Sequence, residues 1–216
     1  SPASEAVAAP VVRRGGVLWG DSVSVMLEQY NSSAAALGKA TFLCSVSLSQ
    51  QNALSYDTGS QRLPEYPKGS GQKPAIEDSV AATGPKWSIS MLGMDNIAYG
   101  IERATNDYLT IINNIVSKNP DVQIVIQSVT PMTETSTSTS EKLNNDQINA
   151  FNAKMQEYCQ ENRCITSMWP RCSKTRMGYL KLEYCSDRNS MGMHFTYDGA
   201  KVWVNYLKTH IPEDLL

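Results

Sequence analysis

The sequence predicts a three-layer α/β fold, in which helices cover both faces of a roughly five-stranded parallel sheet. Apolar, β-prone runs alternate with segments whose apolar residues recur at helical spacing, an alternation that is typical of parallel sheets. With 216 residues, 41% of them hydrophobic, the chain is long enough to bury one large core. We expect a single domain over 11–216, preceded by a flexible Ala/Pro-rich tether over 1–10.

Each predicted strand is an apolar, β-prone run bounded by turn residues. The predicted strands are 11–19, 40–48, 87–92, 122–129 and 164–168. The predicted helices show helical apolar spacing or Pro and Gly at their ends, and they are 22–30, 74–82, 101–118, 143–162 and 197–209. The Gly/Pro-rich segment 55–73 is expected to be a surface loop, the Ser/Thr-rich tract 133–140 a flexible loop, and 171–192 irregular.

Composition argues against several classes of partner. The net charge is -2 and no cluster of Lys and Arg is present, so we expect no nucleic-acid binding. No apolar run approaches the roughly 20 residues that a membrane span needs. A glycine-rich phosphate loop is missing and the two histidines lie outside the cysteine cluster, so neither a cofactor nor a metal is expected.

Four of the five cysteines lie close together in the last third of the chain, at Cys159, Cys164, Cys172 and Cys185. An even cluster of this kind is compatible with one or two disulfides in an exported protein. Zinc is the competing interpretation, but no Cys-x-x-Cys spacing occurs, so disulfides are favoured. Cys44 stands alone in an apolar segment, and we expect it to be a buried free thiol.

The sequence Gly20-Asp21-Ser22 ends the first predicted strand and opens a helix. A serine at this point lies at the carboxyl edge of the sheet, where open α/β sheets bind ligands. The free N–H groups of a helix N-terminus can also stabilise a developing negative charge. This position favours Ser22 as a nucleophile, and the alternative is a serine that only caps the helix.

A serine nucleophile needs a base, and imidazole is the usual one at neutral pH. His194 lies just before the last predicted helix, from which it can return to the edge that carries Ser22. Polar residues also lie at the ends of two further strands, at Ser47 and in the block that starts at Gly93. The sequence therefore brings a nucleophile, a base and several polar groups to one edge of the sheet.

These motifs resemble those of the SGNH/GDSL-type hydrolases, over nearly the whole chain from about residue 16 to residue 207. The resemblance rests on Gly-Asp-Ser after the first strand and on the His-Phe-Thr sequence that begins at His194. It implies a flavodoxin-like fold, with Ser22 as nucleophile and His194 as general base. It also implies an oxyanion hole formed by residues that follow the second and third strands.

The residues that the resemblance assigns to the oxyanion hole depart from the family's pattern. Ser47 stands where the family has glycine, which is tolerable because only a backbone N–H is needed there. The family's Gly-x-Asn-Asp reads Gly93-Met94-Asp95-Asn96, so a carboxylate stands where an amide donor is expected. Loss of one such donor costs on the order of 3–4 kcal/mol in the transition state. Either Asp95 is protonated, or Asn96 turns inward, or the site is weak for acyl transfer.

The acid that would orient His194 also departs from the family's pattern. The family has this acid three residues before the histidine, where the present chain has Met191. Asp187 and Glu183, in the preceding irregular segment, are the two candidate replacements. A backbone carbonyl that orients a Ser–His dyad is the remaining alternative.

The resemblance implies a serine-dependent ester hydrolase, either an acylhydrolase or a carbohydrate O-deacylase, that acts on small-molecule or glycan esters. The small residues at the start of the chain agree with a secreted or cell-surface protein. The alternative is a degenerate hydrolase fold that binds a carbohydrate or an acylated ligand without turning it over. Retention of both Ser22 and His194 favours the enzyme.

Overall fold

A computed structural model of the chain describes residues 15–55, 62–140, 143–162 and 164–211. The expected tether over 1–10 lies outside these residues, so the division of the chain into a tether and one domain stays a prediction. Within the described ranges, no helix has both the length and the apolar character that a membrane crossing needs.

The centre of the fold is a five-stranded sheet in which every neighbouring pair is parallel, in the order β2-β1-β3-β4-β5. The strands are β1 (Val17–Gly20), β2 (Thr41–Cys44), β3 (Trp87–Met91), β4 (Gln123–Gln127) and β5 (Ile165–Ser167). This order is that of flavodoxin-like folds. The predicted fold class is therefore confirmed.

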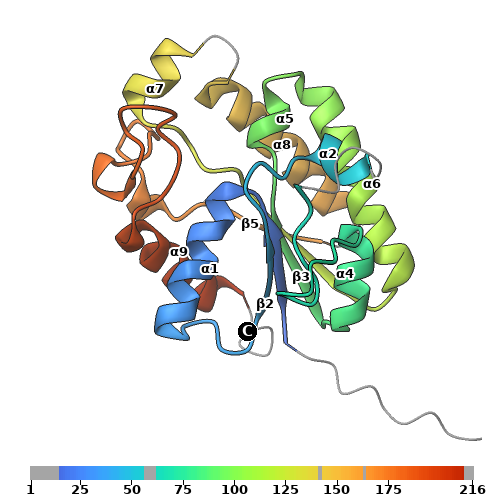
Figure 1. Ribbon diagram of the computed structural model, residues 1–216. Helices are drawn as coiled ribbons and strands as arrows, with labels where there is room; N and C mark the ends of the chain where they lie inside the picture. The colour runs from blue at the N-terminus through green and yellow to red at the C-terminus, as the bar shows by residue number, and fades with distance from the viewer. Residues whose placement is uncertain (1–14, 56–61, 141–142, 163, 212–216) are drawn as a thin grey trace, which may run out of the picture.

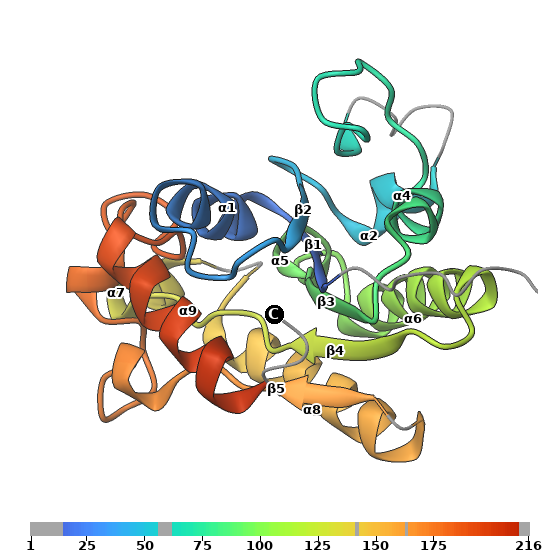
Figure 2. The same cartoon turned by 90° about the horizontal axis from the view of Figure 1, so that it is seen from below.

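Helices cover both faces of the sheet, as Figures 1 and 2 show from two directions. On one face lie α1 (Ser22–Ala34) and α9 (Tyr197–His210), which pack against each other. The other face is covered by α2 (Gln50–Leu54), α4 (Ile76–Thr83), α5 (Met94–Ile97), α6 (Ile101–Lys118) and α8 (Asn145–Asn162). A further helix, α7 (Glu134–Thr139), and two short 3-10 turns, η2 (Arg171–Ser173) and η3 (Leu182–Tyr184), complete the described elements.

The alternation of side chains along β1 shows how the sheet separates two cores. Val17 and Trp19 point into the core under α4, α6 and α8, whereas Leu18 points into the core under α1 and α9. Each of these three side chains is at most 3% exposed. Both faces of a parallel strand are buried in this way, which is why its sequence reads as a continuous apolar run.

Two sequence predictions about this architecture are wrong. The tract 133–140, which we expected to be a flexible loop, instead contains the helix α7, whose hydroxyl side chains bond back to the carbonyls of the preceding turn. The predicted disulfides are absent as well, since all five cysteines are free thiols in the structure. Cys44 is free as expected, but it is only partly buried.

Candidate active site

The polar residues singled out by the sequence gather where β1 and β3 end. In the sheet, β2 lies on one side of β1 and β3 lies on the other side, so the chain passes from β1 to β2 and then crosses over β1 to reach β3. The segments that follow β1 and β3 therefore diverge, and in open α/β sheets such a switch point is where ligands bind. Ser22 follows the end of β1 by two residues, and Asp95 follows the end of β3 by four.

Ser22 is the first residue of α1, and the two residues before it explain the sharp turn. At Gly20, a Cβ would lie 2.4 Å from the Met91 carbonyl oxygen, so β1 and β3 can approach this closely only at a glycine. Asp21 caps the helix, because its Oδ1 accepts a hydrogen bond from the backbone N–H of Val23 at 3.0 Å. The half-buried Ser22 side chain is thus held at the helix N-terminus.

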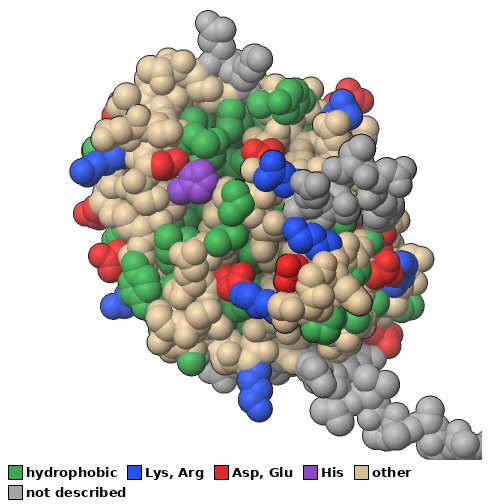
Figure 3. Space-filling view, in the orientation of Figure 1, with side chains coloured by type: hydrophobic (Ala, Val, Ile, Leu, Met, Phe, Trp, Pro, Cys, Tyr) green, Lys and Arg blue, Asp and Glu red, His purple; other side chains and the backbone are tan. Residues whose placement is uncertain are grey.

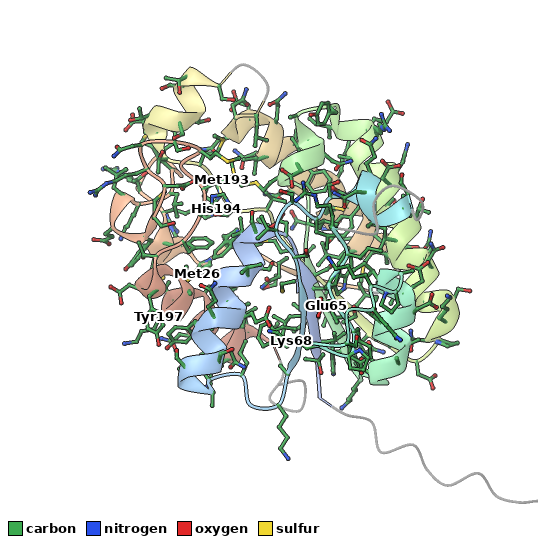
Figure 4. All side chains as sticks on the ribbon, viewed as in Figure 1. Met26, Glu65, Lys68, Met193, His194 and Tyr197 are labelled. Carbon is green, nitrogen blue, oxygen red and sulfur yellow. The ribbon has the colours of Figure 1, made fainter. Side chains whose placement is uncertain are left out.

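A continuous hydrogen-bonded chain links Ser22, His194 and Asp187. Ser22 Oγ lies 2.8 Å from Nε2 of His194, and Nδ1 of the same ring lies 2.7 Å from Oδ2 of Asp187. An ionised carboxylate can only accept, so Nδ1 carries the ring proton and the Ser22 hydroxyl donates to Nε2. Figure 4 shows His194 beside the upper end of α1, where this helix begins.

Asp187 is fixed through its second oxygen. Oδ1 accepts from the backbone N–H of Met193 at 2.9 Å, from the backbone N–H of His194 at 3.0 Å and from the thiol of Cys185 at 3.2 Å. Burial raises the pKa of Asp187, but the hydrogen bonds from His194 and Cys185 more than offset this effect and hold the pKa below its usual value. The carboxylate is therefore ionised at neutral pH.

The seven-residue separation of Asp187 and His194 is explained by a turn that closes on Asp187. The Asp187 carbonyl accepts from the N–H groups of Ser190 at 2.8 Å and Gly192 at 3.1 Å. Gly192 has a φ of +66°, and a Cβ there would lie 2.1 Å from Ser136 Oγ, so the turn needs a glycine. Met191 is carried to the surface of this turn, where it is 45% exposed.

Of the two acid candidates, the structure brings Asp187 to His194 and not Glu183. The Glu183 carboxylate instead lies 3.8 Å from Lys181 Nζ, in an exposed ion pair. Glu183 as the acid is therefore wrong. The backbone-carbonyl alternative is also not what is observed, since the ring nitrogen faces the Asp187 carboxylate.

Ser47 occupies a left-handed turn after β2, with a φ of +60°. This conformation is costly for a residue with a Cβ, so the position favours glycine. Asn52 supports the turn, because its Nδ2 donates to the Ser47 carbonyl at 2.7 Å while its Oδ1 accepts from the N–H of Ser49.

The block after β3 starts at Gly93, which precedes the short helix α5. A Cβ on Gly93 would lie 2.8 Å from the Val129 side chain, so the close packing of this turn needs a glycine. Asn96 is only 3% exposed, whereas Asp95 is partly exposed. Burial raises the pKa of Asp95, and the nearby charges of His194 and Arg62 lower it, with a net increase. Asp95 therefore lies within electrostatic range of His194.

Asp21 is the most perturbed carboxyl group near the site. Burial raises its pKa to about 7, and the hydrogen bond from Val23 opposes this increase only in part. Its Oδ2 is buried without a hydrogen-bond partner in the described structure. The negative charge of Asp95 adds to the increase. Asp21 therefore couples the helix cap electrostatically to the site.

A pocket of about 360 Å³ lies between α7 and the turn that precedes His194. Apolar side chains and hydroxyl groups both line it, and the lining residues are Met132, Ser136, Thr139, Ser140, Leu143, Ser190, Met191 and Met193. Met193 is adjacent to His194, and Figure 4 shows the two side by side. Figure 3 shows hydrophobic side chains gathered around the histidine at the surface. Among the described residues, no group of three or more His, Cys, Asp and Glu side chains could hold a metal ion.

Comparison with known proteins gives a clear result for the fold. No protein-family model matches the sequence, and no curated protein matches it. Solved structures match nearly the whole chain. A GDSL-like lipase from Bacteroides thetaiotaomicron is 13% identical, with a TM-score of 0.66 over 90% of this chain and 85% of that chain. The lipase/acylhydrolase from Enterococcus faecalis is 12% identical, with a TM-score of 0.64 over 92% of this chain and 95% of that chain. The chain has the SGNH hydrolase fold.

An acetyl xylan esterase also shares this SGNH fold, with 11% identity and a TM-score of 0.62 over 91% of this chain and all of that chain. Structural neighbours of the chain are thus esterases and acylhydrolases. At such low identities the likeness concerns the fold, and the chemistry has to be argued from the residues themselves.

Two features of the site escaped the sequence analysis. The thiol of Cys185 contacts Asp187, whereas the sequence assigned this cysteine to a disulfide cluster. The pocket beside Met193 is formed partly by α7, which the sequence presented as a loop. The spacing Cys185-x-Asp187 is a signal for the first feature, but only once Asp187 is known to be the partner of His194.

Proposed function

We propose that this protein is a serine-dependent ester hydrolase in which Ser22 is the nucleophile, His194 the general base and Asp187 the orienting acid. The observation that carries the proposal is the continuous chain of hydrogen bonds Ser22–His194–Asp187, with lengths of 2.8 and 2.7 Å. These distances lie within the range in which a base can accept the proton of a nucleophile.

In the first half-reaction, Ser22 Oγ attacks the ester carbonyl carbon while its proton passes to Nε2 of His194. The carbonyl oxygen becomes an oxyanion, and the ionised Asp187 stabilises the imidazolium that forms. Collapse of the tetrahedral intermediate breaks the bond to the alcohol oxygen. The alcohol leaves with the proton from Nε2, and the acyl group stays on Ser22.

In the second half-reaction, water takes the place of the alcohol. His194 Nε2 accepts one proton from the water, whose oxygen attacks the acyl carbon. The second tetrahedral intermediate then releases the carboxylic acid, and Ser22 Oγ recovers its proton. In both half-reactions, each proton that leaves an oxygen passes through the same ring nitrogen.

The oxyanion would be held by the backbone N–H groups of Ser22 and Ser47, with a third group from Asp95 or Asn96. The helix N-terminus supports the Ser22 contribution, since the first N–H groups of a helix have no partner within it. Asp95 is partly exposed whereas Asn96 is 3% exposed, and this accessibility favours Asp95 as the third group. A carboxylic acid can donate only when it is protonated.

The substrate class proposed is a small-molecule or glycan ester. The acetyl xylan esterase that shares the fold has such a substrate, and the pocket beside Met193 offers hydroxyl and thioether contacts for the group beyond the ester. A secreted or cell-surface location agrees with this substrate class and stays a prediction.

Hydrolysis of aryl esters from acetyl to octanoyl tests the proposal. We expect the parent protein to hydrolyse at least one of these esters, and we expect Ser22→Ala to remove this activity. Ser32→Ala is the matched control, because Ser32 is an exposed serine of the same helix whose hydroxyl donates to the Glu28 carbonyl. Stoichiometric labelling of Ser22 by a sulfonyl fluoride, located by peptide mass spectrometry, would identify the nucleophile directly. Equal rates for the parent and Ser22→Ala across the series would instead favour the alternative, a hydrolase fold that binds a carbohydrate or an acylated ligand without turning it over.

A further inference from the structure

The thiol of Cys185 is buried against the carboxylate of Asp187. Cys185 is 4% exposed, and its Sγ lies 3.2 Å from Oδ1 of Asp187. Burial, with the hydrogen bond to Asp187, raises the pKa of this thiol to about 12, so that it remains protonated. A protonated thiol beside an ionised carboxylate can only be the donor of the pair.

The main chain around Cys185 holds the thiol in this position. Cys185 forms an antiparallel bridge with Phe195, and the N–H of Ser186 donates to the His194 carbonyl at 2.9 Å. The segment that carries the thiol is therefore tied to the segment that carries the imidazole. Cys185 also packs in the core under α9, among residues that include Phe195.

The three donors on Oδ1 divide into two types. Two are backbone N–H groups, from Met193 and His194, and both lie on the His194 side of the turn. Cys185 supplies the only side-chain donor to this oxygen among the described residues, and it approaches from the segment before Asp187. With donors from both sides, the carboxylate is held so that Oδ2 faces Nδ1 of His194.

We propose that Cys185 is a positioning residue, whose thiol fixes the rotamer of Asp187 and thereby the hydrogen bond that His194 Nδ1 donates to Asp187. The expected effect of Cys185 on ester turnover rests on the function proposed above. The expected effect on the hydrogen bond between the Asp187 carboxylate and the His194 ring does not, and it can be measured even in a protein without esterase activity.

The alternative is that Cys185 only fills space under α9. Three substitutions separate the two roles. Cys185→Val removes the hydrogen-bond donor but keeps a side chain of similar volume. Cys185→Ala removes the donor and also leaves a smaller side chain. Cys185→Ser keeps a hydrogen-bond donor. Cys159→Ala is the matched control, because Cys159 is another buried cysteine, 3% exposed, that lies in the opposite core.

The first measurement is the exchange with water of the His194 ring N–H, followed by NMR on protein labelled with ¹⁵N-histidine. The chain has only two histidines, and the exposed ring of His210 serves as an internal reference. We expect Cys185→Val and Cys185→Ala to accelerate exchange at His194 by about three- to tenfold, as loss of one weak charge-assisted donor allows. Cys185→Ser and Cys159→Ala should leave the exchange rate close to that of the parent.

The second measurement is ester turnover. We expect the Val and Ala variants to lower kcat by about three- to tenfold with KM unchanged, because Cys185 does not touch the substrate. Faster ring exchange in a protein that hydrolyses no ester would support the positioning role and contradict the proposed function. Exchange rates and kcat in Cys185→Val equal to those of Cys159→Ala would overturn the positioning role, and would leave Cys185 as a packing residue.

Discussion

Asp187 and His194 are joined twice through one carboxylate. Oδ2 of Asp187 lies 2.7 Å from the ring Nδ1 of His194, and Oδ1 lies 3.0 Å from the backbone nitrogen of the same residue. One side chain therefore fixes both the ring and the main chain of the proposed base. This double contact is why we propose Asp187 as the acid, although it lies seven residues before His194 and the resemblance implied an acid three residues before it.

Replacement of Asp187 tests this relationship. Asp187→Asn keeps the shape of the side chain, but its amide can present an N–H to Nδ1 and so stabilise the wrong imidazole tautomer. We expect kcat to fall on the order of 10⁴-fold, as in serine hydrolases that lose the same interaction. The measurement is kcat on the best aryl ester, with Glu183→Gln as the control, since Glu183 pairs with Lys181 and should have no effect. A loss below tenfold in Asp187→Asn would show that the acid does not orient the ring.

Asp95→Asn tests the proposed oxyanion hole. Asn supplies an amide donor at every pH, whereas Asp95 can donate only while it is protonated. The pKa of Asp95 is raised by burial, so the parent should lose activity as the pH rises through this pKa, and the variant should not. We therefore expect Asp95→Asn to hydrolyse esters at least tenfold faster than the parent at pH 8, because one oxyanion donor is worth about 10²–10³ in kcat. Equal pH profiles for the two proteins would mean that the carboxylate lies outside the oxyanion hole.

Ser47→Gly tests the role assigned to the turn after β2. Ser47 has a φ of +60°, a conformation that costs a residue with a Cβ roughly 1 kcal/mol relative to glycine. The variant should gain about this much in free energy of unfolding, less the entropy that glycine adds to the unfolded chain. Activity should be retained, since only the backbone N–H is needed. Ser47→Ala keeps the strained backbone conformation, so this variant should keep its activity but should not be more stable than the parent. Urea unfolding and ester hydrolysis check both variants.

The strands and the long helices could be predicted from the sequence because buried parallel strands and amphipathic helices leave strong apolar patterns. The helices α2, α5 and α7 could not, because none is longer than six residues, which is too short to show a helical apolar repeat. Contacts elsewhere in the fold stabilise such short helices. One example is the N–H of Asn145, which donates to Thr137 Oγ1 of α7.

The site was predictable to the extent that local sequence positions it. Ser22 lies in a turn that two neighbouring residues define, and His194 precedes a helix that the sequence shows clearly. From the sequence, Asp187 was one of two candidates for the acid that orients His194. The choice stayed open because the segment between Asp187 and His194 can fold in several ways. The hydrogen bonds that select it, from Ser190 and Gly192 to its carbonyl, become visible only in three dimensions.

Asp21→Asn tests the buried carboxyl group that directly precedes Ser22. Burial raises the pKa of Asp21 to about 7, whereas in the unfolded chain it returns to its usual value near 3.8. Between these two pH values the folded protein holds a proton that the unfolded chain has lost, so this group lowers the free energy of unfolding as the pH rises. The stability lost over this window is at most on the order of 4 kcal/mol.

Asn can cap α1 in the same way as Asp without this titration. The difference in free energy of unfolding between Asp21→Asn and the parent should therefore grow in favour of the variant from pH 4 to pH 8. Because Asp95 has a raised pKa as well and interacts with Asp21, the comparison between the two proteins reports Asp21 together with this interaction, whereas the parent's curve alone also contains the separate titration of Asp95. Urea unfolding at the two pH values measures the difference. A difference that stays constant would show that Asp21 does not change its protonation across this range, and that its carboxylate is tolerated within the fold.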